Sequence, residues 1–201
     1  FKDPDGSYAK FREHYAQFGL GVETGIDLPY EATGYNGGTQ KLGNLMDFAI
    51  GQFDTYTTMQ LAQYVATIAN DGVRMQPHLM KEIRDPDHEI DEQGKLIEEF
   101  KPVEMNKVDL EEEYMDRIQE GFRRVFQGSR GTATSYFRGV DYNPAGKTGT
   151  AQVYNSAKKG YDHNLTLVGY APFDQPEVAF AVVAPSVKSS SSSINKHIGR
   201  S

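Results

Sequence analysis

The amino-acid sequence predicts an α+β fold, in which helices flank an antiparallel sheet. Apolar residues recur at intervals of three and four within residues 7–126, a spacing typical of amphipathic helices. Three strand-like segments follow, at residues 146–154, 165–171 and 178–184. Because the connections between these strands are short, we expect them to be neighbours in an antiparallel meander.

The first helices are predicted from capping residues and glycines. Ser7 is expected to cap a helix over residues 7–18, which Gly19 ends. A second, short helix is expected over residues 44–48, with its asparagine as the cap. Residues 22–43 lie between these helices and are rich in glycine, threonine and proline, so they are expected to form a loop.

The clearest helix starts at Thr57 or Thr58 and ends at the Asn-Asp-Gly sequence of residues 70–72. A longer amphipathic helix is expected to start at Asp109, its cap, and a short helical piece is expected over residues 132–137. The inner sides of the two long helices are predicted to carry Met59, Leu61, Ala62, Val65, Ala66 and Ile68 in the first, and Leu110, Tyr114, Ile118, Phe122 and Val125 in the second.

The chain is expected to form one domain over residues 1–188, followed by a low-complexity tail over residues 189–201 that starts a truncated terminal helix. Residues 77–108 are expected to form a polar hairpin insertion, with strands at 80–84 and 94–103. The hairpin carries acidic residues at Asp87, Glu89, Asp91, Glu92, Glu98 and Glu99. Since they lack the spacing of an EF-hand, we interpret them as a solvated face rather than a calcium loop.

Composition excludes several classes of site and function. The formal net charge of −7 argues against a nucleic-acid surface. The absence of cysteine excludes disulfides and thiolate metal sites, and the five histidines show no metal-ligand spacing. No apolar stretch approaches the roughly 20 residues of a membrane helix. No cofactor or metal is therefore expected.

The motif that offers the most groups for binding or catalysis is residues 145–152, Ala-Gly-Lys-Thr-Gly-Thr-Ala-Gln. In an extended strand Lys147 and Gly149 would lie on one side, and Thr148 and Thr150 on the other. The missing side chain of Gly149 would let the backbone of another molecule approach. An ammonium group beside hydroxyls and open backbone N–H groups suits an anionic substrate group or a developing oxyanion.

This Lys-Thr-Gly-Thr strand resembles the third motif of the penicillin-recognising serine acyltransferases. Four further landmarks stand in the order found in the transpeptidase domain of class B penicillin-binding proteins, and the resemblance covers roughly residues 11 to 185. These landmarks are Phe-Gly-Leu-Gly at 18–21 with Thr-Gly-Ile-Asp-Leu-Pro at 24–29, Ala-Ile-Gly-Gln at 49–52, the run from Thr57 to Pro77 that contains Ala-Asn-Asp-Gly, and Gly-Tyr-Ala-Pro at 169–172.

The resemblance assigns roles to the motif. Lys147 would supply positive charge near the serine of the family's Ser-x-Asn motif and near the substrate carboxylate, which the hydroxyls of Thr148 and Thr150 would bind. The backbone N–H of Thr150 would be one oxyanion donor. Gly149 and Gln152 would line the same edge of the substrate site.

The resemblance has further implications for the surroundings of this strand. The Gly-Thr-Ala segment at residues 131–133 would pack beside it, and His163 and Asn164 would reach the cleft.

Two other motifs of the family, Ser-x-x-Lys and Ser-x-Asn, precede Lys-Thr-Gly in the family's chains. Here the matching patterns, Ser156–Lys159 and Ser193–Lys196, both follow Lys147. We therefore expect a nucleophilic serine upstream of this chain, a fold that is incomplete here, and an inactive fragment. Such a fragment should expose apolar surface.

The function implied is that of a peptidoglycan D,D-transpeptidase, which cross-links stem peptides through a serine acyl-enzyme and is acylated by β-lactam antibiotics. Its implied partners are the upstream segment and other cell-wall synthesis proteins, with no nucleic acid. The implied location is the outer face of the cell membrane, and the implied biological role is in cell shape or cell division.

Alternatives on the same fold are a β-lactam sensor and a non-catalytic wall-binding module. A nucleotide-binding P-loop is a distant alternative, because Gly-Lys-Thr ends such loops. Its first glycine is replaced here by Asp141.

Overall fold

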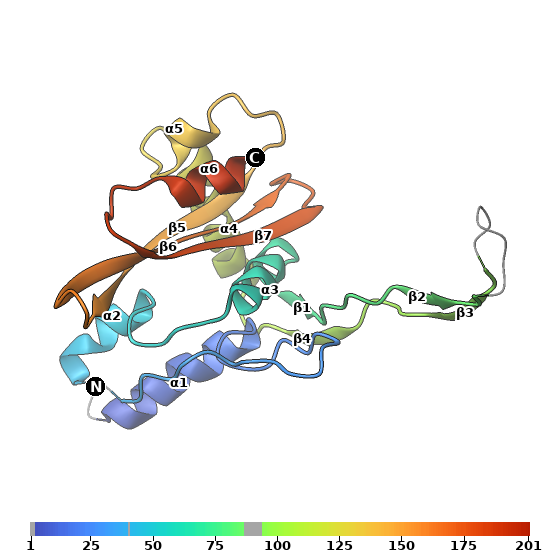
Figure 1. Ribbon diagram of the computed structural model, residues 1–201, viewed down its shortest axis with the longest axis horizontal. Helices are drawn as coiled ribbons and strands as arrows, with labels where there is room; N and C mark the ends of the chain where they lie inside the picture. The colour runs from blue at the N-terminus through green and yellow to red at the C-terminus, as the bar shows by residue number, and fades with distance from the viewer. Residues whose placement is uncertain (1–2, 40, 87–93) are drawn as a thin grey trace.

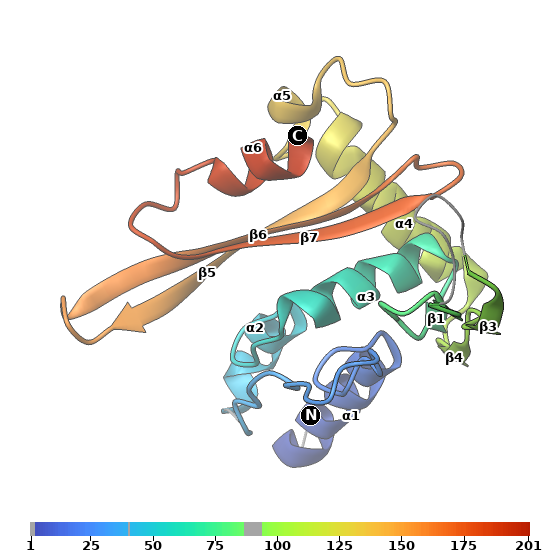
Figure 2. The same ribbon diagram turned by 45° about the vertical axis from the view of Figure 1, so that its right-hand side comes forward.

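The computed structural model describes residues 3–39, 41–86 and 94–201. A three-stranded antiparallel sheet lies between two groups of helices, and a long two-stranded arm projects away from this body (Figures 1 and 2). The expected α+β class is confirmed. Among the described residues, no helix is both long and apolar enough to span a bilayer.

The sheet consists of β5 (Ala145–Asn155), β6 (Gly160–Ala171) and β7 (Val178–Val187), in the order β5-β6-β7. β6 pairs with the whole length of β5 on one side and with most of β7 on the other, in antiparallel register. The predicted meander is therefore confirmed, and β5 forms one edge of this sheet.

The two faces of the sheet carry different cores. Val168 of β6 packs with α3 (Thr58–Ala69) and α4 (Glu112–Gln127), whereas its neighbour Leu167 packs with Phe126 and α5 (Thr134–Phe137) on the other face. Figure 2 shows α3 below the sheet and α5 above it, beside α6 (Ile194–Arg200).

α1 (Pro4–Gln17) starts earlier than predicted, because Asp3 rather than Ser7 caps it. The Asp3 carboxylate accepts a hydrogen bond from the N–H of Gly6, and proline suits the first helical position because it lacks an N–H group. Gly19 follows the helix at a φ of 92°, which confirms the expected glycine stop. The side chain of Ser7 instead donates to the carbonyl of Asp3.

The expected short helix is α2 (Leu45–Ala49), and a 3-10 turn, η1 (Leu42–Asn44), precedes it. Asn44 occupies the N-cap position of α2, as predicted, but its side chain makes no capping hydrogen bond. Phe48 of α2 is fully buried between Tyr8, Phe11 and Tyr15 of α1, with ring centroids 4.9 to 5.9 Å away. This aromatic cluster packs α2 against α1.

α3 confirms the clearest helix prediction, with Thr57 as its cap. The Thr57 hydroxyl accepts from the N–H of Gln60, whose side chain in turn accepts from the N–H of Thr57. Such a capping box satisfies two N–H groups that the helix itself cannot. α3 is thereby given a defined start beneath the sheet.

Thr57→Ala is expected to lower the free energy of unfolding by about 1 kcal/mol, because the N–H of Gln60 loses its acceptor. Thr58→Ala, at an exposed position one residue later, is the matched control and should change stability by less than about 0.5 kcal/mol. Urea unfolding monitored by circular dichroism would measure both. Equal effects of the two substitutions would contradict the capping role.

α4 starts at Glu112, three residues after the predicted cap, Asp109. Its buried residues are Met115, Phe122 and Phe126. The prediction was right for Phe122 and wrong for Leu110 and Tyr114, whose exposed fractions are 37% and 52%. Ile118 and Val125 are partly buried against the two cores.

The predicted hairpin forms the projecting arm. β1 (Val73–Met75) pairs with β4 (Glu104–Lys107) near the body, and β2 (Glu82–Arg84) pairs with β3 (Leu96–Glu99) farther out (Figure 1). The four residues of β3 are all exposed, among them Glu98 and Glu99, as expected of a solvated face. Asp87, Glu89, Asp91 and Glu92 lie outside the described residues.

The residues after β7 lead into α6, which packs on the sheet. The amide of Asn195, which is 2% exposed, donates to the carbonyl of Thr166 in β6 at 2.8 Å. Lys196 lies over the ring of Tyr136, 4.8 Å from its centroid. α6 therefore closes the α5 side of the sheet, where a helix start was expected.

Candidate active site

The start of β5 is buried and fixed by α4. The side chain of Gln127 donates to the side chain of Asn143 at 2.7 Å and to the carbonyl of Pro144 at 2.8 Å. A side chain at Gly146 would collide with the ring of Phe126 and the carbonyl of Val168. Only glycine therefore lets α4 lie this close to the strand, directly before Lys147.

β5 presents its ammonium and hydroxyl groups on opposite faces, as predicted from the alternation. Lys147 pairs with Val168, which faces α3, and Thr148 pairs with Leu167, which faces α5. Thr150 lies two residues beyond Thr148 and shares its face. A ligand that contacts both kinds of group must therefore lie along the edge of β5, rather than on either face.

Lys147 is exposed, and its ammonium group donates to the carbonyl of Thr148 at 2.6 Å. This bond folds the lysine side chain back along its own strand, toward the hydroxyl-bearing residues. Nearby protein groups displace part of the water around the ammonium, which lowers its pKa below the ordinary lysine value. The described part of the chain gives it no carboxylate within salt-bridge distance.

The hydroxyl of Thr148 is oriented by a second hydroxyl. Its Oγ1 lies 2.8 Å from Oγ1 of Thr132, which precedes α5. The expected packing of the Gly-Thr-Ala segment beside the strand is thus confirmed, but sequence reasoning gave Thr132 itself no role. In the sequence, the only signal that pointed to Thr132 was its position in the Gly-Thr-Ala segment. Thr132 and Thr150 are both exposed, so the hydroxyls are open to solvent.

The glycine at position 149 is explained by a contact within the chain, whereas the sequence suggested the approach of another molecule. A Cβ there would collide with Oγ1 of Thr166, its partner on β6. The Thr166 side chain therefore occupies the space that Gly149 leaves.

The remaining predicted residues lie farther along the strand. Gln152 is exposed and pairs with His163, which shares its face of the sheet. The Nδ1 atom of His163 is buried and has no hydrogen-bond partner among the described residues. The side chain of Asn164 instead accepts a hydrogen bond from the N–H of Ser186 at 3.0 Å, and this bond links β6 to β7.

Neither of the two Ser-x-x-Lys matches has the arrangement of an activated nucleophile, although Ser193 is the residue at the start of α6. Ser156 and Lys159 lie in the turn between β5 and β6, and both are exposed. Ser193 precedes α6, where Lys196 is engaged with Tyr136. The P-loop alternative is also wrong, because residues 145–155 continue as a strand where a P-loop requires a helix.

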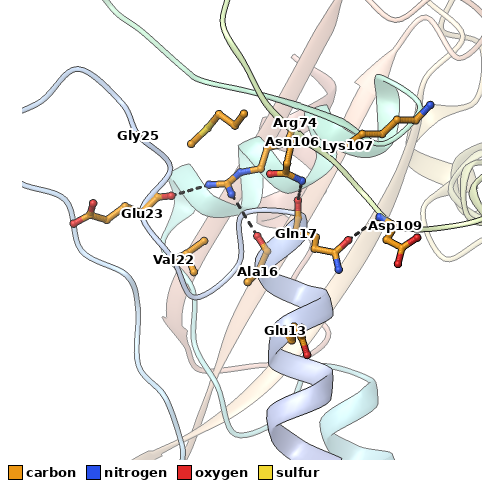
Figure 3. A pocket seen from close by; sticks show the side chains of 11 residues that line it. Glu13, Ala16, Gln17, Val22, Glu23, Gly25, Arg74, Asn106, Lys107 and Asp109 are labelled. Atoms are coloured by element: carbon orange, nitrogen blue, oxygen red, sulfur yellow. Dashed lines mark hydrogen bonds between the residues drawn. The ribbon is translucent and has the colours of Figure 1, made fainter.

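A hollow of about 680 Å³ lies elsewhere, between α1, the loop after it and the β1–β4 pair (Figure 3). Arg74 lies in it with 6% of its surface exposed, and donates to the side chain of Gln63 at 3.0 Å and to the carbonyl of Glu23 at 2.7 Å. Burial lowers the pKa of Arg74, opposed by the charge of Glu31. Arg74 thus joins three segments structurally, and no residue of β5 lines this hollow.

Comparisons with known proteins identify the family of this chain. Residues 5–201 match the family model of the penicillin binding protein transpeptidase domain. Penicillin-binding protein 2A of Bacillus subtilis (strain 168) is 50% identical over 184 residues, which are 89% of this chain and 25% of that protein. Peptidoglycan D,D-transpeptidase MrdA of Escherichia coli (strain K12) is 30% identical over 197 residues, which are 87% of this chain and 30% of that protein.

A solved structure has the same fold. Penicillin-binding protein 2B of Streptococcus pneumoniae (strain R6) superimposes with a TM-score of 0.86 at 38% identity, over 98% of this chain and 32% of that one. The chain thus spans about a quarter to a third of the length of these relatives. The match to the family model extends over nearly the whole sequence, and the chain therefore belongs to the penicillin-binding protein transpeptidase domain family.

Proposed function

We propose that this chain forms one wall of the active site of a peptidoglycan D,D-transpeptidase, whose nucleophilic serine comes from a segment outside this sequence. The observation that carries the proposal is the edge of β5, where Lys147 and the hydroxyls of Thr148 and Thr150 flank a single strand. Membership of the transpeptidase family and the D,D-transpeptidase name of one relative support the reaction.

An edge strand can hold a peptide substrate by adding it to the sheet. Main-chain groups of an extended peptide pair with the free edge of the strand, while side chains at the edge read its chemistry. In this proposal the terminal carboxylate of a stem peptide accepts hydrogen bonds from the Thr148 and Thr150 hydroxyls. The Lys147 ammonium then adds positive charge beside that carboxylate.

The acylation step follows from that placement. The serine hydroxyl attacks the carbonyl carbon of the penultimate D-alanine and gives up its proton to a neighbouring base. The carbonyl oxygen becomes an oxyanion, which the backbone N–H of Thr150 stabilises together with a second donor near the serine. The C–N bond then breaks, the last D-alanine leaves with the proton on its amine, and an ester remains.

The ester is then consumed by an amine of a neighbouring stem peptide. That amine attacks the ester carbonyl, the new amide forms, and the serine recovers its proton. A β-lactam would follow the first half of this path, because attack of the serine on its ring carbonyl breaks the ring C–N bond and also leaves a serine ester, with the nitrogen still attached to the opened ring. We further infer that the longer protein is held at the cell membrane and works with other cell-wall synthesis proteins.

A fluorescent penicillin tests this function. We expect the longer protein that carries this chain to form a covalent adduct stable to denaturation, and the chain alone to form none. Adduct formation by the isolated chain that survives Ser156→Ala together with Ser193→Ala would contradict the proposal. Acylation of the longer protein without any cross-linking of stem peptides would favour a β-lactam sensor instead.

A further inference from the structure

The β5–β6 hairpin carries two exposed tyrosines beyond the candidate active site. Tyr154 and Tyr161 lie directly opposite each other across the strands, and their exposed fractions are 59% and 58%. Their rings pack edge to face, with centroids 5.6 Å apart at 72°. Such a pair stabilises the hairpin, yet more than half of its aromatic surface remains open.

The tyrosines share a face with the hydroxyl groups. Tyr154 follows Thr148, Thr150 and Gln152 at intervals of two residues, so all four side chains project from the same side of β5. From Thr150 to Tyr154 the strand advances about 14 Å, at roughly 3.4 Å per residue. One ligand lying along the edge can therefore reach both groups.

The direction in which such a ligand extends is fixed by the burial of β5. Ala145 and Gly146 are buried beneath α4 and Phe126, whereas the strand is exposed from Gln152 to Tyr154. A peptide whose terminal carboxylate lies at Thr148 and Thr150 must extend toward the tyrosines. Its amino-terminal part then lies beside Tyr154, which makes it antiparallel to β5.

The hairpin end is also held in place before any ligand binds. The side chain of Asn155 donates to Asp162 at 2.6 Å and accepts from the N–H of Ala157 at 3.1 Å. Asp162 in addition forms an ion pair with Lys158 across the turn. Preorganised side chains lose little conformational entropy on binding, which favours a recognition role for the tyrosine pair.

We propose that Tyr154 and Tyr161 form a distal subsite for the stem peptide, which binds the side chain carried three or four residues before the terminal carboxylate. This deepens the proposed function and rests on it. An antiparallel peptide advances at the same rise as β5, so about four residues separate the groups that meet Thr150 and Tyr154. Open tyrosine rings suit a side chain with a long aliphatic stem, and they also attract a cationic end group.

The test compares substrates of different length on the longer protein that carries this chain. The substrates are N-acetylated peptides ending in D-alanyl-D-alanine, with two and with five residues, and a fluorescent penicillin is the third reagent. For Tyr154→Ser combined with Tyr161→Ser, we expect kcat/KM to fall about tenfold for the long peptide, as the loss of roughly one buried side-chain contact implies. The dipeptide and the penicillin should react within about twofold of the unchanged protein.

The control variant is Tyr30→Ser, which removes a tyrosine that is 92% exposed and lies on the loop after α1. It should leave all three reactions unchanged. If the double variant lost nothing, or lost the short and long peptides equally, the distal subsite would be wrong while the proposed function stood. If the unchanged protein failed to react with penicillin at all, the proposed function would fail first.

Discussion

Lys147→Ala is expected to slow acylation of the longer protein by a β-lactam by about two orders of magnitude. Removing one well-placed electrostatic donor commonly costs about 3 kcal/mol in the transition state. Folding should be nearly unaffected, because the Lys147 side chain is exposed and its one hydrogen bond is to the carbonyl of the next residue. Stopped-flow acylation and thermal unfolding measure the two quantities separately.

The matched control for the lost charge is Lys188→Ala, at an exposed position near the end of β7. It removes one positive charge without touching β5, so the acylation rate should change by less than about twofold. Equal losses in the two variants would mean that Lys147 acts only through net charge. An unchanged rate in Lys147→Ala would show that the ammonium has no part in the reaction.

The same ammonium predicts a limit at alkaline pH. Because nearby protein groups displace part of the water around the ammonium and lower the pKa of Lys147, the group loses its proton at a lower pH than an ordinary lysine does. If the charged form is needed, the acylation rate falls as pH rises through that lowered pKa. The fall should be absent from the residual activity of Lys147→Ala, which a pH–rate profile of both proteins would show.

Local sequence signals predicted the parts of the fold that local interactions decide. The sheet followed from strand-like segments joined by short connections, and α3 from a threonine start, a helical repeat of apolar residues and the Asn-Asp-Gly sequence at its end. The faces of Lys147 and Thr148 followed from the alternation of side chains in a strand. None of these features depends on a contact with a distant segment.

The start of α4 was missed because a distant contact decides it. The backbone N–H of Asp109 donates to the side chain of Gln17 in α1 at 2.7 Å, and the preceding Val108 is buried. These contacts hold residues 108–110 outside the helix, so α4 begins later than predicted. Thr132 was missed for a similar reason, since its partner Thr148 lies 16 residues away across α5.

Phe126→Ala is expected to lower the free energy of unfolding by about 3–5 kcal/mol, the range for deleting a buried aromatic side chain. Phe126 is 1% exposed and stacks on Phe137 of α5, with ring centroids 4.1 Å apart. Its ring also packs against the backbone of Gly146, directly before Lys147. The cavity should therefore loosen both the turn that carries Thr132 and the buried start of β5.

A control on the same helix separates the two predicted faces of α4. Tyr114→Ala removes a ring that is 52% exposed, so its effect on stability should stay below about 1 kcal/mol. Denaturant unfolding of the longer protein, followed by near-ultraviolet circular dichroism, measures both variants. If Tyr114 lay on the inner face, as the sequence predicted, its loss would rival that of Phe126. A ratio well above two therefore requires the inner face that carries Met115, Phe122 and Phe126, which is also the face that places α4 against Gly146, directly before Lys147.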